Sequence, residues 1–168
     1  MVSLLVTGGC GFLRSCFINH YFAAEKPLKL INLDSLSVNN IALSIQEDPN
    51  YHAVKGKLRD GDLINYLLKK HAITHVIHFA DYDACDVKDS LAHTTDVICG
   101  AHLLMETCHN YATIPYIHVS LKTEDSVLLA TNNAAELILN AYADRYDIPL
   151  QLLCITDVAD VPKIGRFL

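Results

Sequence analysis

Six short apolar runs alternate along the chain with longer segments whose apolar residues recur at helical spacing. The runs are short and rich in β-branched or aliphatic residues, which is typical of strands buried in a parallel sheet. They cover residues 4–6, 28–33, 51–54, 74–79, 114–119 and 150–155. Strand and helix in strict alternation predict an α/β fold, a Rossmann-like doubly wound parallel sheet of about six strands.

The segments between these runs predict the helices. One extends from Phe12 to Ala24, and a second is capped by Asp60 or Asp62. Two longer helices are expected at 90–110 and 129–146. Residues 35–48 are ambiguous, a loop with a short helix, and 157–168 show no pattern, so they are expected to form a tail. The predicted organisation is one Rossmann domain at 1–156 followed by that tail, with no internal repeat.

Right-handed crossovers of this length predict the strand order 3-2-1-4-5-6. In such a sheet the ligand crevice lies at the carboxyl ends of the strands, where the strand order reverses. That point falls between the first and fourth strands. Residues at the ends of these strands are therefore the first candidates for a site.

Composition narrows the class of protein. Half of the 168 residues are apolar, which excludes disorder, and no apolar run reaches the roughly 20 residues of a membrane span. No basic leader follows Met1, so no signal peptide is expected. A net charge of −6 argues against non-specific nucleic-acid binding. Six cysteines without a C-x-x-C pair predict reduced thiols and a cytoplasmic location, and nine histidines without ligand spacing predict no metal site.

The first strand leads into the turn Thr7-Gly8-Gly9-Cys10-Gly11 and then a helix. Backbone N–H groups and the helix N-terminus of such a turn can face a pyrophosphate. Gly8 and Gly11 hold the first two glycine positions of G-x-x-G-x-x-G, but Arg14 stands at the third. Asp34 ends the second strand where a ribose-binding acid belongs, although an aspartate there can also simply cap the next turn.

Several segments, taken in order, resemble the extended short-chain dehydrogenases, in the NAD-dependent epimerase/dehydratase branch and closest to the dTDP-glucose 4,6-dehydratases. The segments are TGGCGFLRS, LINLDSLS, KGKLRDGDLINYLL, THVIHFAD, PYIHVS and NNAAELILNAYADRYDIPLQLL. The resemblance implies a Rossmann fold that binds NAD. It places cofactor contacts at Gly8, Gly11, Phe12, Leu13, Asp34, Ser35, Leu58 and Ala80.

The chain departs from the family pattern at the cofactor. Lys57 replaces an aspartate that usually faces adenine, and Asp81, with Asp83 nearby, brings negative charge toward the nicotinamide ribose. Asp96 and Val97 stand where Thr-Asn is usual. We expect the Arg14 side chain to occupy part of the pyrophosphate groove, with Asp81 or Asp83 as its partner. NAD binding is expected to be weak or lost, and the two outcomes stay open.

The departure at the catalytic positions is larger. The family uses Tyr-x-x-x-Lys, and the alignment on Ala134-Ala135-Glu136 puts Leu128 and Asn132 there. Leucine cannot transfer a proton, so no catalytic residue is expected. Thr123-Glu124-Asp125 repeats the family's Thr-Asp-Glu two residues late, and Lys122 lies beside it. Only thirteen residues follow the sixth strand, so the family's substrate domain is not expected.

These departures predict a pseudoenzyme kept for nucleotide binding, assembly or regulation. An active NAD-dependent dehydratase or oxidoreductase, with displaced groups or completed by a partner chain, stays open, as does a truncation product without function. The apolar outer faces of helices 90–110 and 129–146 predict a homodimer joined by a four-helix bundle. The alternatives are a monomer with a broad apolar stripe and a complex with a related full-length enzyme. No nucleic acid or membrane partner is expected.

Overall fold

The computed structural model describes residues 2–8, 12–23, 28–34, 46–80, 91, 94–164 and 166. The strands are β1 (Val2–Gly8), β2 (Leu28–Asp34), β3 (Tyr51–Lys55), β4 (His75–Ala80), β5 (Tyr116–Leu121) and β6 (Leu150–Ile155). The helices are α1 (Phe12–Ala23), α3 (Gly61–His71), the π-helix η2 (Thr95–Cys99), α5 (Gly100–Tyr111), α6 (Ser126–Tyr146), the 3-10 helix η3 (Val158–Asp160) and α7 (Val161–Ile164).

All six strands are parallel and form one sheet in the order β3-β2-β1-β4-β5-β6. This confirms the predicted fold class and strand order. The central strands are buried on both sides, which explains their continuous apolar runs. On the edge strand β3, by contrast, buried Tyr51 is followed by partly or fully exposed residues.

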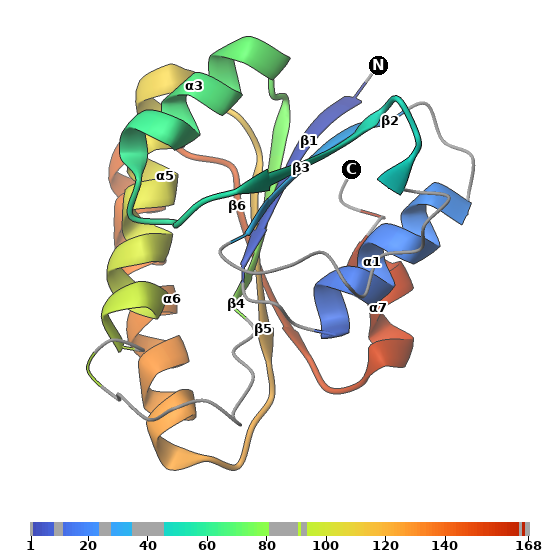
Figure 1. Cartoon of the computed structure of the whole chain (residues 1–168). Coiled ribbons are helices and arrows are strands. Elements are labelled where there is room, and N and C mark those ends of the chain that lie inside the picture. Colours follow the sequence, from blue (N-terminus) through green and yellow to red (C-terminus); the bar gives the residue numbers. More distant parts are fainter. Residues whose placement is uncertain are drawn as a thin grey trace.

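Helices cover both faces of the sheet, with α3, α5 and α6 on one side and α1 and α7 on the other (Figure 1). Alternate residues of each strand therefore enter two different cores. Leu4 of β1 packs with Phe17 of α1, whereas its neighbour Leu5 packs with Leu104 of α5. Because alternate residues point to opposite faces of the sheet, only strand residues of the same parity can meet on one face.

Several boundaries differ from the prediction, for local reasons. α6 begins at Ser126 rather than 129, because the Asp125 carboxylate caps it by accepting from the N–H groups of Val127 and Leu128. β5 begins at Tyr116, one residue after Pro115, which has no N–H to donate. The single helix expected at 90–110 is interrupted by the π-helix η2 before α5 starts at Gly100.

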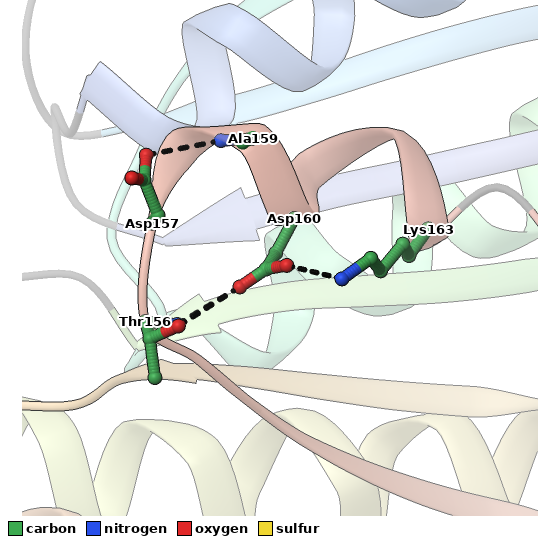
Figure 2. A network of polar contacts seen from close by, with 5 residues as sticks. All are labelled: Thr156, Asp157, Ala159, Asp160 and Lys163. Carbon is green, nitrogen blue, oxygen red and sulfur yellow. Dashed lines mark hydrogen bonds and ion pairs between the residues drawn. The ribbon is translucent and has the colours of Figure 1, made fainter.

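The C-terminal segment expected as a tail forms η3 and α7. The Thr156 N–H and hydroxyl both donate to the Asp160 carboxylate, which also pairs with Lys163 (Figure 2). Val161 and Ile164 are buried in the core beside α1. A four-residue helix is too short to show a periodicity in the sequence, so the pattern of apolar residues could not predict it.

Two further observations concern the whole described chain. None of its described helices is long and apolar enough to cross a membrane. The described cysteines, Cys16, Cys99, Cys108 and Cys154, carry free thiols.

Candidate functional site

The strand and the helix on either side of the predicted glycine-rich turn form as the sequence predicts. β1 ends at Gly8 and α1 starts at Phe12. Leu13, in the first turn of α1, is buried in the core on that face. The predicted contact residue Gly11 lies outside the described residues, as does Ser35. The corner therefore directs the first turn of α1 to the carboxyl end of the sheet, where dinucleotides bind in folds of this kind.

Arg14 pairs with Asp34, the residue expected to bind ribose. Each side chain is only 2% exposed, so the pair is buried between α1 and the end of β2. A buried arginine needs an acid partner, because an uncompensated charge in the interior is costly. The structure thus places the Arg14 guanidinium on the ribose side of the corner. Asp81 and Asp83, its expected partners, lie outside the described residues.

Neighbouring groups extend this polar cluster. The Asn32 side-chain amide donates to the Tyr51 hydroxyl over 2.8 Å, from β2 to β3. Burial raises the pKa of Tyr51, while the Asn32 bond and the Arg14 charge act in the opposite direction. Lys55 is the register partner of Asp34 on β3 and is exposed. The end of β2 is therefore flanked by two cations, Arg14 and Lys55.

The carboxyl end of β2 does not fit the ribose of NAD in the way the resemblance implies. A ribose-binding aspartate must offer its oxygens to the ribose hydroxyls. Here the Asp34 carboxylate is almost fully buried and already accepts the Arg14 guanidinium. A ribose hydroxyl would have to compete with this charged donor, and hydrogen bonds to ionised groups are the stronger ones.

Leu58 lies in the loop between β3 and α3, and Ala80 lies at the end of β4. Ala80 ends β4, is buried, and pairs in register with Ser120 of β5. Leu58 is half-buried against the start of α5, where a Cβ added to Gly100 would lie 3.1 Å from the Leu58 Cβ. Of the eight predicted cofactor residues, the described ones thus lie at the ends of β1, β2 and β4, at the start of α1 and in the loop before α3.

The positions that correspond to the family's catalytic tyrosine and lysine lie on α6. Leu128 and Asn132, which the alignment puts at the tyrosine and lysine positions, both lie in its first two turns and are half-buried. The Ser120 hydroxyl at the end of β5 donates to the Glu136 carboxylate of α6 over 2.8 Å. Sequence reasoning missed this bond, because it joins residues of two elements that only the packing brings together.

The displaced Thr-Asp-Glu residues are used to start α6. The Asp125 carboxylate caps the helix, and the Thr123 hydroxyl accepts from the Asp125 N–H over 3.1 Å. Glu124 and Lys122 are exposed. Two of the three groups that could have restored the family chemistry are therefore engaged in local backbone bonds.

A row of buried polar side chains crosses the sheet from β1 through β4 to β5, close to the carboxyl ends of these strands. Thr7, His78 and His118 are register neighbours on β1, β4 and β5. The Thr7 hydroxyl lies 3.0 Å from His78 Nδ1, and the two imidazole centroids are 5.2 Å apart. Burial lowers the pKa of His118 to about 4 and, together with the charge of His118, holds that of His78 well below its usual value. Both rings are therefore neutral at pH 7.

The histidine row was also missed, although a signal existed. His78 and His118 each stand one residue before the last residue of an apolar run, 74–79 and 114–119, so pairing of these runs as parallel strands can place them side by side. In the part of the chain that the structure describes, no three His, Cys, Asp or Glu side chains are grouped to hold a metal ion.

Comparison with known proteins agrees with this architecture. The GDP-mannose 4,6 dehydratase family model matches residues 5–122, a range that ends before α6. A dTDP-D-glucose 4,6-dehydratase of Dictyostelium discoideum is 36% identical over 123 residues, covering 70% of this chain and 28% of that protein. A trifunctional protein of Arabidopsis thaliana that includes UDP-glucose 4,6-dehydratase is 31% identical over 175 residues, covering 88% of this chain and 26% of that protein.

A solved structure supports the same assignment. The crystal structure of dTDP-glucose 4,6-dehydratase from Bacillus anthracis in complex with NAD superposes with a TM-score of 0.79 at 27% identity. The match covers 92% of this chain and 54% of that one, so this chain spans about half of its length. The matched range, the parallel sheet and the strand order agree: the chain belongs to the family described by the GDP-mannose 4,6 dehydratase model, in the NAD-dependent epimerase/dehydratase branch of the short-chain dehydrogenases.

Proposed function

We propose that this chain is a non-catalytic relative of the nucleotide-sugar dehydratases that serves as a nucleotide-binding and assembly module. The observation that carries the proposal is the pair of residues on α6, Leu128 and Asn132, at the positions aligned with the family's tyrosine and lysine. A leucine side chain can neither donate nor accept a proton, and an asparagine amide carries no charge with which to lower a neighbour's pKa.

The nearby polar groups support the same proposal. Asp125 and Thr123 bond to the start of α6, and Ser120 is buried against Glu136. A general acid or base must reach the reacting proton at about 2.6–3.2 Å, directly or through one water. Groups held in local bonds would have to break them to do so, which argues against displaced residues replacing the lost pair.

Assembly is the second part of the proposal. The outer face of α6 is apolar for a surface helix, with Leu137 70% exposed and Leu129 44% exposed. Tyr142 and Tyr146 lie 4.6 Å apart between ring centroids, and both rings contact His109 of α5. We expect η2, α5 and α6 of two copies to pair as a four-helix bundle, or the same face to bind a related full-length enzyme.

The apolar outer face is smaller than the sequence suggests. Leu103, an apolar residue of α5, lies near Gly61 at the start of α3, where a Cβ added to Gly61 would be 3.7 Å from the Leu103 side chain. Tyr111 and Tyr142 also pack partly against the core below α5 and α6. The part of the expected interface that remains most exposed is therefore on α6.

Two measurements on the purified chain test the catalytic and binding parts of the proposal. Incubation with NAD and dTDP-glucose should give no NADH and no 4-keto-6-deoxy sugar. Titration with NAD, NADH, NADP and NADPH should raise the melting temperature for at least one nucleotide, because a ligand at a hundredfold excess over its Kd adds about 2.7 kcal/mol of stability. Turnover would overturn the non-catalytic part, and no stabilisation by any nucleotide would overturn the binding part.

A further inference from the structure

The charges around the end of β2 decide which nucleotide this site would favour. Arg14 and Lys55 lie on either side of Asp34, the first through the buried ion pair and the second as its register partner on β3. We infer that a dinucleotide bound here is preferred in its 2′-phosphorylated form, because these two cations outnumber the carboxylate at the adenosine ribose. The inference rests on the proposed function, since it concerns the same nucleotide site.

A single aspartate at this point has the opposite effect. Its oxygens accept the ribose hydroxyls, and its negative charge repels a 2′-phosphate, which carries a charge of up to −2. Sites that accept the phosphate instead place an arginine nearby. The sign of the local charge is therefore the physical quantity that separates the two nucleotides.

In this chain the local charge is positive. The Arg14 guanidinium keeps its charge at any accessible pH and compensates that of Asp34 within the buried pair. Lys55 shares a face of the sheet with Asp34, because residues in register on parallel strands project to the same side. Among the described residues at the end of β2, one carboxylate against two cations leaves a net charge of +1.

The other members of the cluster do not reverse this sign. The Asn32 amide is neutral, and Tyr51, which accepts its hydrogen bond, is kept neutral by burial, which raises its pKa. Both side chains are buried on the face of the sheet that α1 covers. A 2′-phosphate at the end of β2 would meet the exposed Lys55 and a carboxylate whose charge Arg14 already compensates, whereas a 2′-hydroxyl would have to displace Arg14 from Asp34.

Calorimetric titration of the purified chain with NAD and NADP tests this inference. We expect NADP to bind at least threefold more tightly than NAD. Arg14→Met, which keeps an unbranched side chain but not the charged guanidinium group, should lower this preference by about tenfold, and Lys55→Met should lower it less, because Lys55 is exposed and its charge is screened. Asp34→Asn should raise the preference, and this opposite shift keeps the test valid if Arg14→Met fails to fold.

Two controls separate this effect from general electrostatics and from structural damage. Lys69→Met removes an exposed charge from the last turn of α3 and should leave the preference unchanged. Adenosine 2′,5′-bisphosphate should bind more tightly than the 3′,5′-isomer, which carries the same charge at another position. A purely structural role of Arg14 would change the affinity for both dinucleotides by the same factor.

The outcomes distinguish this inference from the proposed function. Tighter binding of NAD than of NADP by the unmodified chain would overturn the inference while leaving a nucleotide-binding module. Equal effects of Arg14→Met on both dinucleotides would also overturn it. No binding of either dinucleotide would overturn the inference and the nucleotide-binding part of the proposed function together.

Discussion

Acid should destabilise this fold through the buried histidine row, and replacing His118 should remove much of that sensitivity. His118 is fully buried, and neither ring nitrogen has a hydrogen-bond partner among the described residues. Its pKa is about 4 in the folded chain, against about 6.5 when unfolded. Between these values the unfolded chain binds a proton that the folded chain does not. The free energy of unfolding therefore falls as the pH falls.

The size of the effect follows from the two pKa values. The gap between about 6.5 and about 4 corresponds to about 3 kcal/mol when both states are protonated, and about 2 kcal/mol of it is lost between pH 7.5 and pH 5. His78 acts in the same direction, because burial and the neighbouring His118 hold its pKa well below its usual value. The surface carboxylate of Asp160, whose pKa is lowered to about 2, matters only at more acidic pH.

Urea unfolding followed by circular dichroism at pH 7.5 and pH 5 measures this loss. We expect His118→Leu to reduce the loss by about 2 kcal/mol, because leucine does not titrate and fits a buried apolar site. At pH 7.5 the variant should be close to the unmodified chain in stability, since it removes two unpaired buried polar atoms. His20→Leu, on the exposed side of α1, is the matched control. An unchanged pH dependence in His118→Leu would refute the reasoning.

Three further predictions follow from single contacts. Asp125→Ala removes the cap of α6 and should lower the free energy of unfolding by about 1 kcal/mol, measured by urea unfolding; an effect near zero would mean that water replaces the carboxylate. Arg14→Gly should raise the affinity for NAD, because it frees the Asp34 carboxylate, and calorimetry showing equal or weaker binding would contradict this. Ile138→Asp places a charge at a half-buried position of α6, next to the exposed Leu137, and should convert a homodimer to monomer in sedimentation at micromolar concentration, whereas Gln151→Asp, exposed on the edge strand β6, should not. If the unmodified chain is already monomeric there, the proposed homodimer is wrong.

The catalytic interpretation depends on the sequence more than on the structure. Leu128 and Asn132 are assigned by aligning Ala134-Ala135-Glu136, and side-chain chemistry alone excludes proton transfer at Leu128. The packing adds what the alignment could not, namely that Thr123 and Asp125 are engaged in starting α6. A capping bond depends on where the helix begins, and the sequence pattern placed that start three residues late.

The sequence by itself determined the fold class, the strand order and the succession of β1 and α1. These features depend on patterns that are local or that repeat along the chain: apolar runs for strands, helical spacing for crossovers, and a right-handed connection between them. Strand β6 was predicted to the residue, because its apolar run is bounded by Pro149 on one side and polar residues on the other. Right-handed crossovers between buried parallel strands allow few other strand orders for a chain of six strands and their connecting helices.

Only the tertiary structure decided which side chains meet. The sequence shows that Arg14 needs an acidic partner, and we expected Asp81 or Asp83, whereas the packing of the first turn of α1 over the end of β2 pairs it with Asp34. Strand register likewise brought His78 beside His118. Such contacts depend on the positions of elements far apart in the chain, and small changes in helix start or strand register exchange one partner for another.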